Sequence, residues 1–240
     1  RSCLVGSEMC IRDRLSTTPL VINELNSRVD ELNSYPRILI SGGDKLQQSH
    51  INHIKSHTTV YNTYGPTETT VCATFGKVSA NASNIGKPIA NHAIYIVDEN
   101  EKKQAVGVVG EIYIAGPGVA KGYINKEKET LEQFVKNPFG VGKCYKTGDL
   151  ARWNEDGTIE FIGRKDSQIK VRGYRVELDE VNLAIESCKK IKQSVTLVYK
   201  DAYGNNTIVS YYIVQENVKE SELRFETVSY THLTLPTSPK

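Results

Sequence analysis

The sequence of 240 residues predicts an α/β layer, followed by a β-barrel-like part and the start of a small α+β domain. Three observations support this fold class. Over residues 15–80, apolar strands alternate with helical segments, which is typical of a parallel α/β layer. Over residues 81–165, short strands are separated by Gly- and Asp-rich turns, a pattern that favours a small barrel or a sandwich. Over residues 166–227, a strand, a helix and a β-rich pair follow each other.

The α/β layer is expected to contain two helices and two strands. Pro36 ends the first helical segment, and Gly42-Gly43-Asp44 follows the first strand as a turn. The expected elements are a helix from Leu20 to Leu32, a strand over 37–41, a helix over 45–56 and a strand over 58–61.

The β-rich part is interrupted by one amphipathic helix near residues 125–134. Its strands are expected over 93–98, 110–115, 144–153 and 158–162. In the third part, the expected elements are a strand over 168–172, a helix over 178–187 and two strands over 194–199 and 207–214. Residues 201–206 have the composition of the turn between the last two strands.

Both ends differ in character from the residues next to them. Residues 1–14 and 228–240 resemble translated sequencing-adapter read-through, so we expect them to be non-native. A genuine tag or tail is the alternative. The only methionine is Met9, so the remaining body has no start residue and is expected to be a fragment of a larger protein.

Composition excludes several classes of protein. Lys and Arg number 30 against 28 Asp and Glu, which is not the charge pattern of a nucleic-acid-binding protein. No apolar run approaches the roughly 18 residues of a transmembrane helix, so no membrane partner is expected. The five cysteines form no Cys-x-x-Cys pair, and the opening lacks the pattern of a signal peptide. We therefore expect a cytoplasmic protein.

The most informative segment runs from Asn62 to Glu68, Asn-Thr-Tyr-Gly-Pro-Thr-Glu. It follows a predicted strand and turns sharply at Gly65-Pro66. A threonine hydroxyl suits a phosphate oxygen, and the adjacent glutamate suits Mg²⁺, which prefers carboxylates together with substrate phosphates. A Tyr-Gly-Pro turn is also frequent as a purely structural element.

Two further segments stand out, one with a carboxylate that can bind a ribose and one rich in charged residues. In Lys146-Thr-Gly-Asp-Leu150, the carboxylate of Asp149 could accept hydrogen bonds from the two hydroxyls of a ribose, or it could cap a turn. The charges between Gly163 and Leu178 could form a solvated face. Gly173 lies between bulky residues there, which indicates a bend or a close backbone approach.

The glycines of the segment from Gly110 to Ile124 lack the strand-then-helix context of a dinucleotide fingerprint. Taken together and in this order, however, these four segments resemble the adenylate-forming, AMP-binding superfamily. They resemble most specifically the amino-acid adenylation domains of nonribosomal peptide synthetases. The resemblance covers residues 15–227.

The resemblance implies roles for the first segment. Asn62 would contact the edge of the adenine, and Tyr64 would stack on it. Thr67 would bind the α-phosphate, and Glu68 would bind Mg²⁺. Residues 15–80 would thus be the end of a nucleotide-binding α/β layer.

The resemblance also implies roles in the later segments. Asp149 would hold the ribose hydroxyls, Arg164 would contact ribose or phosphate, and Phe161 would replace a usual tyrosine near the nucleotide. Asp166 matches the hinge of the C-terminal domain, and Gly173 would line the pantetheine path in the thiolation state.

By the pattern of the family, five residues would line the amino-acid side-chain pocket. Most of them are small or apolar, which favours a hydrophobic amino acid. They are Ile40, Gly42, Thr63, Val71 and Cys72.

The implied activity is activation of an amino acid with Mg·ATP and transfer of the acyl group to the phosphopantetheine thiol of a carrier protein. Thr67, Glu68 and Arg164 would be the catalytic residues. Peptidyl carrier and condensation domains are expected partners in the same parent chain. The upstream phosphate loop and the C-terminal lysine of the family are not in this sequence, so the isolated fragment is expected to be inactive.

Alternatives remain open. A standalone acyl-CoA or aryl-acid ligase of the same superfamily is one, although Gln168 favours the peptide-synthetase branch. A non-catalytic nucleotide-binding remnant is another. Separately, His50, His53 and His57 would share one face of the expected helix, which permits a metal site but also fits a surface helix.

Overall fold

The computed structural model describes residues 13–79, 81–165, 168–171, 174–188, 191–200 and 206–214. The chain forms two compact units, Arg1–Asp166 and Ser167–Lys240. The expected boundary between residues 165 and 166 lies one position before this division. The proposed hinge Asp166 and the glycine Gly173 lie outside the described residues.

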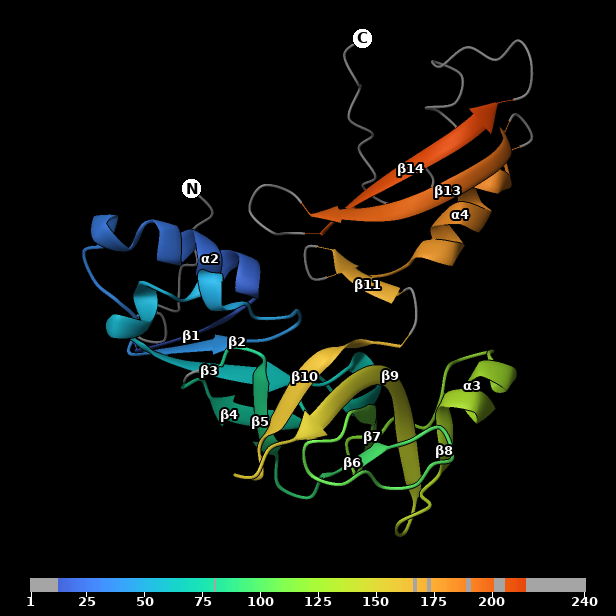
Figure 1. Cartoon of the computed structure of the whole chain (residues 1–240), viewed down its shortest axis with the longest axis horizontal. Helices are drawn as coiled ribbons and strands as arrows, with labels where there is room; N and C mark the ends of the chain where they lie inside the picture. Colours follow the sequence, from blue (N-terminus) through green and yellow to red (C-terminus); the bar gives the residue numbers. More distant parts are fainter. Residues whose placement is uncertain are drawn as a thin grey trace. The chain divides into compact units, whose positions relative to one another are not determined.

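Within the described residues, the first unit is built on one ten-stranded sheet (Figure 1). Strands β1 (Arg14–Thr17), β2 (Ile38–Ser41) and β3 (Thr59–Tyr64) pair in parallel, which confirms the predicted parallel pairing. Strands β4 (Thr74–Lys77) and β5 (Asn84–Pro88) continue the sheet in antiparallel order. Strand β1 begins at Arg14, inside the segment that the sequence marked as non-native.

A helical layer packs on the parallel strands. It consists of α2 (Pro19–Ser27) and the 3-10 segments η1 (Val29–Glu31), η2 (Gln48–His50) and η3 (Ile54–Ser56). Apolar side chains between this layer and the sheet form one buried core. Its fully buried members include Ile22, Leu39, Leu46, Ile51 and Ile54.

The single helix expected over residues 45–56 is wrong, because two separate 3-10 segments form there. The reason is a tertiary hydrogen bond. The side-chain carbonyl of the buried Asn26 accepts from the backbone N–H groups of His53 and Ile54, at 2.9 and 3.0 Å. Those N–H groups are therefore not available to the i→i−4 bonds of a continuous helix.

The β-rich part extends the same sheet. Beyond β5 the order is β10 (Ile159–Arg164), β9 (Lys143–Trp153), β7 (Gly110–Ala115) and β6 (Ala93–Val97), with β8 (Phe134–Lys136) on β9. The expected helix is α3 (Glu127–Gln133). In the described residues, this strand path is open between β1 and β6, so barrel-like closure remains a prediction.

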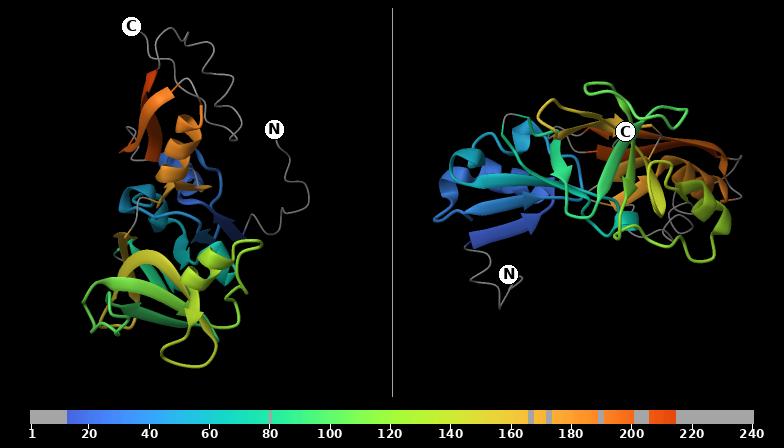
Figure 2. Two further views of the ribbon diagram at one scale, coloured as in Figure 1. Left: turned by 90° about the vertical axis from the view of Figure 1, so that its right-hand side faces the viewer. Right: turned by 90° about the horizontal axis from the view of Figure 1, so that it is seen from below.

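In the second unit, the predicted strand, helix and hairpin occur in the expected order, and one further strand that was not predicted precedes the helix. Strands β11 (Gln168–Val171) and β12 (Tyr174–Glu177) pair, and α4 (Leu178–Glu186) follows. Helix α4 lies along one side of the hairpin formed by β13 (Ile191–Lys200) and β14 (Asn206–Val214), as Figure 2 shows. In the described part of the chain, we find no helix long and apolar enough to cross a membrane.

Two glycines allow β4 and β5 to approach closely. A Cβ atom on Gly76 would lie 2.3 Å from the Cα atom of Gly86, and Gly86 itself has a φ of +83°. No side chain fits between these backbones, so glycine is required at Gly76 on steric grounds alone.

We therefore expect Gly76→Ala to lower the free energy of unfolding by about 1–3 kcal/mol, the usual cost of overpacking. Urea unfolding followed by circular dichroism measures this difference. Gly163→Ala is the matched control, because a Cβ atom at Gly163 would meet nothing within 4 Å. Equal stabilities of the two variants would contradict the steric argument.

Candidate nucleotide-binding site

The loop from Tyr64 to Thr70 leaves the carboxyl end of β3 and contains the 3-10 segment η4 (Thr67–Thr69). Gly65 lets this loop pack against the chain that returns to β4. A Cβ atom on Gly65 would lie 2.7 Å from the backbone nitrogen of Ala73 and 2.8 Å from the carbonyl oxygen of Val71. The glycine is therefore needed for the shape of the loop.

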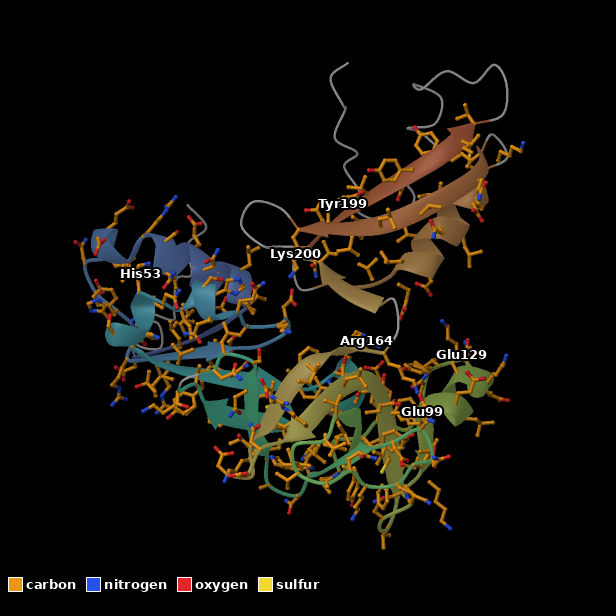
Figure 3. The ribbon with its side chains drawn as sticks, in the orientation of Figure 1. His53, Glu99, Glu129, Arg164, Tyr199 and Lys200 are labelled. Atoms are coloured by element: carbon orange, nitrogen blue, oxygen red, sulfur yellow. The ribbon has the colours of Figure 1, made fainter. Side chains whose placement is uncertain are left out.

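The carboxylate of Asp149 binds residues from two other strands. The Tyr64 hydroxyl donates to Oδ2 of Asp149 at 2.5 Å, and Nη1 of Arg164 donates to Oδ1 at 2.7 Å. Asp149 is only 8% exposed, so these charge-assisted bonds compensate for the burial of its charge. Figure 3 shows Arg164 at the end of β10. Burial raises the pKa of Tyr64 well above its usual value, and the neighbouring Asp149 carboxylate adds to this rise.

The backbone around Asp149 is fixed as well. Asp149 and Arg164 are direct partners in the antiparallel β9–β10 pair. The Asp149 N–H donates to the Thr147 hydroxyl at 3.0 Å, and that hydroxyl donates to the Ile112 carbonyl at 2.9 Å. Arg164 also donates to the Thr147 carbonyl at 3.1 Å. The site is thus built on paired strands and not on a free loop.

Phe161 lies beside Tyr64, with ring centroids 6.0 Å apart and the planes tilted by 41°. Lys45, which directly follows the Gly-Gly-Asp turn after β2, lies over the ring of Phe161. Its Nζ atom is 5.6 Å from the Phe161 centroid and donates to the Ile162 carbonyl at 3.2 Å. The sequence analysis did not identify Lys45, although its place at the carboxyl end of a parallel strand was a usable signal.

Glu68 is 9% exposed and is held by a tyrosine from a distant segment. The Tyr123 hydroxyl donates to Oε1 of Glu68 at 2.7 Å and lies 3.3 Å from the Tyr145 hydroxyl. Burial raises the pKa of Tyr123, and the hydrogen bonds to Tyr145 and Glu68 raise it further. The phenol therefore stays a donor at neutral pH. Tyr123 is a second residue that the sequence analysis missed.

These contacts bring most of the expected nucleotide-binding residues together. Tyr64, Asp149, Phe161 and Arg164 form one connected group. Glu68 is connected through Tyr123 to Tyr145, which lies on β9, the strand that carries Asp149. Thr67 is exposed beside Glu68.

Asn62 is placed differently from this group. It is 3% exposed, and its amide nitrogen donates to the carbonyls of Ala82 and Asn84, both at 3.1 Å. Both amide hydrogens are thus used inside the fold. A contact with adenine would have to use the side-chain oxygen as acceptor.

The five residues expected to line the amino-acid pocket fall into two groups, one of three residues at the ends of β2 and β3 and one of two residues in the loop before β4. A Cβ atom on Gly42, which follows the strand carrying Ile40, would lie 2.6 Å from Oγ1 of Thr63. Val71 is 76% exposed and adjoins Cys72. The Cys72 N–H donates to the Thr70 carbonyl at 2.8 Å, around Val71 with a φ of 70°.

Two hollows in the first unit are lined by none of these five residues. One, of about 480 Å³, is lined by residues of the segment 121–131. The other, of about 360 Å³, is lined by residues of the segments 51–60 and 77–79. The side-chain pocket for an amino acid therefore remains a prediction.

The donor set limits how a cation could bind. Over the described ranges, no group of three or more His, Cys, Asp or Glu side chains comes together. A cation at Glu68 would therefore depend on oxygens of the nucleotide phosphates, which is how Mg²⁺ usually binds with ATP. The histidines at 50, 53 and 57 do not share one helical face, because two separate 3-10 segments replace the expected helix. His50 is buried, and the ring of His57 stacks on that of Tyr35 with centroids 4.3 Å apart.

Comparison with known proteins agrees with this geometry. Residues 13–124 match the family model of the AMP-binding enzymes. The matching region contains the Tyr64–Glu68 loop, and it includes the first residue of β1. The chain belongs to the AMP-binding enzymes.

The relatives in sequence define more narrowly which kind of AMP-binding enzyme the chain resembles. Over 215 residues the chain is 45% identical to gramicidin S synthase 2 of Brevibacillus brevis, a match that covers 87% of this chain and 5% of that protein. It is 43% identical over 215 residues to tyrocidine synthase 3 of Brevibacillus parabrevis, covering 87% of this chain and 3% of that one.

A solved NRPS protein with adenylation and PCP domains, PA1221 in its holo form, superposes with a TM-score of 0.79 at 29% identity. The superposition covers 88% of this chain and 38% of that protein. The chain is part of a nonribosomal peptide synthetase adenylation domain, and it spans only a small share of the curated relatives.

We expect Tyr64→Phe to lower the free energy of unfolding by about 1–3 kcal/mol, because it leaves a buried carboxylate oxygen with one donor fewer. Urea unfolding measures the loss. Tyr95→Phe serves as the control, since the Tyr95 ring packs on Phe139 at 4.6 Å and that packing is retained. A loss no larger than that of the control would contradict the importance of the Tyr64–Asp149 bond.

The pH dependence of stability should report on His50. Burial lowers its pKa below 6.5, although Asp44 opposes this shift. The unfolded chain therefore binds the proton more readily, and stability falls as the pH drops below about 6.5, by at most about 1.4 kcal/mol per pH unit. Comparing unfolding of the wild type and His50→Gln between pH 7 and pH 5 isolates this effect. An identical pH slope in both proteins would contradict it.

Proposed function

We propose that the parent of this chain activates an amino acid for nonribosomal peptide synthesis. The carboxylate of the amino acid attacks the α-phosphorus of ATP, an aminoacyl-adenylate forms and pyrophosphate leaves. The acyl group then passes to the phosphopantetheine thiol of a carrier protein. The observation that carries the proposal is the Tyr64–Asp149–Arg164 group, in which the carboxyl ends of β3 and β10 meet Asp149 on β9. Glu68 is connected through Tyr123 to Tyr145, which also lies on β9.

Asp149 fits the role of ribose ligand. A carboxylate can accept hydrogen bonds from two vicinal hydroxyls. Here Tyr64 and Arg164 already donate to the two carboxylate oxygens. Ribose hydroxyls would compete with these donors or share the oxygens with them. Phe161 and Tyr64 would supply flat apolar surface for the adenine next to this position.

Thr67 and Glu68 fit the phosphate end of a nucleotide. A hydroxyl and a carboxylate are oxygen donors, as Mg²⁺ prefers, and they follow each other in η4. When bound, Mg²⁺ would neutralise charge on the phosphate oxygens. Arg164 would add a second positive charge. Catalysis of this kind rests on position and charge, so no covalent nucleophile from the protein is required.

The amino-acid side of the reaction rests on the resemblance. Ile40, Gly42, Thr63, Val71 and Cys72 would line a pocket for a hydrophobic side chain, and Asp166 and Gly173 would serve the later thiolation step. Carrier and condensation domains would be partners in the parent chain. The relatives named as synthases of gramicidin S and tyrocidine support an amino-acid substrate over the carboxylic-acid substrate of a standalone acyl-CoA or aryl-acid ligase.

Nucleotide binding by the 240-residue chain tests the proposal. We expect AMP to bind weakly to the wild type, as measured by isothermal titration, and Asp149→Asn to weaken binding about tenfold or more through loss of a charged hydrogen-bond acceptor. Glu155→Gln is the control, because Glu155 is an exposed acid in the turn between β9 and β10. Equal AMP affinity in all three proteins would contradict the ribose assignment.

The same chain should not catalyse amino-acid-dependent ATP–pyrophosphate exchange on its own. Measurable exchange would overturn the expectation that the isolated chain is inactive. If the wild type binds no AMP at all, the nucleotide-binding assignment itself is contradicted.

A further inference from the structure

The contact between Tyr123 and Glu68 joins two segments that are 55 residues apart. The Tyr123 hydroxyl donates to Oε1 of Glu68 at 2.7 Å, which is the short distance of a hydrogen bond to a charged acceptor. Glu68 is 9% exposed, and its own carbonyl accepts from the Ala120 N–H at 2.8 Å. Both the backbone and the side chain of Glu68 are thus bound by the segment around residue 120.

Tyr123 is itself held in place by α3. Its backbone N–H donates to Oγ1 of Thr130 at 2.9 Å, and Thr130 in turn donates to the Lys126 carbonyl at 2.7 Å. Next to it, Gly122 has a φ of +153°, and a Cβ atom there would lie 2.3 Å from Cγ2 of Thr130. Only glycine allows this approach, so helix and loop are fitted closely to each other.

The ring of Tyr123 is also fixed. It packs edge-on against Phe134, with centroids 5.2 Å apart and planes at 73°. Its hydroxyl lies 3.3 Å from the hydroxyl of the fully buried Tyr145. The phenol therefore has little freedom to leave Glu68. Packing of the ring against Phe134 would not require a hydroxyl group, whereas the Tyr123 hydroxyl donates to the carboxylate of Glu68.

We propose that Tyr123 is a positioning residue for Glu68, and that α3 acts on the metal end of the nucleotide site through it. The proposal rests on the proposed function, in which Glu68 binds Mg²⁺ together with the nucleotide. By holding Oε1, the Tyr123 hydroxyl restricts rotation of the carboxylate and presents it to the cation in one orientation. Groups that orient a metal ligand in this way contribute strongly to metal affinity.

The test measures metal binding and not catalysis. Mn²⁺ replaces Mg²⁺ as a spectroscopic probe, and electron paramagnetic resonance measures its binding to the 240-residue chain in the presence of AMP. We expect Tyr123→Phe to weaken Mn²⁺ binding about tenfold, the lower range for residues that support a metal ligand. AMP binding without metal should not change, since Tyr123 contacts only Glu68 among the proposed nucleotide ligands.

Tyr113→Phe is the matched control. Tyr113 is 2% exposed, and its hydroxyl donates to Oε1 of another glutamate, Glu101, at 3.2 Å. This variant loses the same kind of bond at another place and should bind Mn²⁺ like the wild type. A second variant, Thr130→Val, keeps the phenol but removes the acceptor for the Tyr123 N–H. It should weaken Mn²⁺ binding in the same direction, and it replaces Tyr123→Phe if that protein does not fold.

The outcomes separate the two proposals. Glu68→Gln should abolish Mn²⁺ binding. If it does so while Tyr123→Phe and Thr130→Val bind Mn²⁺ like the wild type, the positioning role is overturned and the proposed function stands. Equal losses in the Tyr123 and Tyr113 variants would also overturn the positioning role. If Glu68→Gln binds Mn²⁺ unchanged, or the wild type binds none, the metal role of Glu68 fails, and the positioning role fails with it.

Discussion

The buried carboxylate of Asp149 is the constraint on which this site depends. A charge that is 8% exposed must be compensated by donors from the protein, or its burial would oppose folding. The donors come from Tyr64 at the end of β3 and from Arg164 at the end of β10. Because one carboxylate binds both, the end of the parallel layer and the end of the β-rich part are held at one place.

The same arrangement explains why the loop after β3 has a defined shape. Tyr64, the first residue of the loop, is hydrogen-bonded to Asp149, and Glu68 is hydrogen-bonded to Tyr123. Gly65 between them allows the close approach to the chain near Ala73. Two anchors and one steric requirement thus fix a segment of five residues, without any regular helix longer than η4.

Local patterns in the sequence predicted nine of the fourteen strands among the described residues and missed β1, β4, β5, β8 and β12. The motif order predicted that Tyr64, Asp149, Phe161 and Arg164 serve one site. Long-range contacts were beyond such patterns. The Lys45 side chain donates to the carbonyl of Ile162, 117 residues further along the chain, and no local pattern predicts that contact. The helix expected over 45–56 failed for the same reason, because the Asn26 side chain takes its hydrogen-bond donors. Roles that need a ligand, such as those of Thr67 and Asn62, remain predictions.

The close approach of Gly76 and Gly86 lies where the ladder of the first unit is weakest. Strand β4 pairs with β5 through only two residue pairs, and β5 pairs with β10 through two more. By contrast, β9 and β10 share five. Thermal opening of this unit costs least where the fewest ladder bonds must break. Within the first unit, the short ladders at β5 thus form the weakest backbone link between the parallel strands and the β-rich part. The hydrogen bond from Tyr64 on β3 to Asp149 on β9 is a side-chain bridge across it.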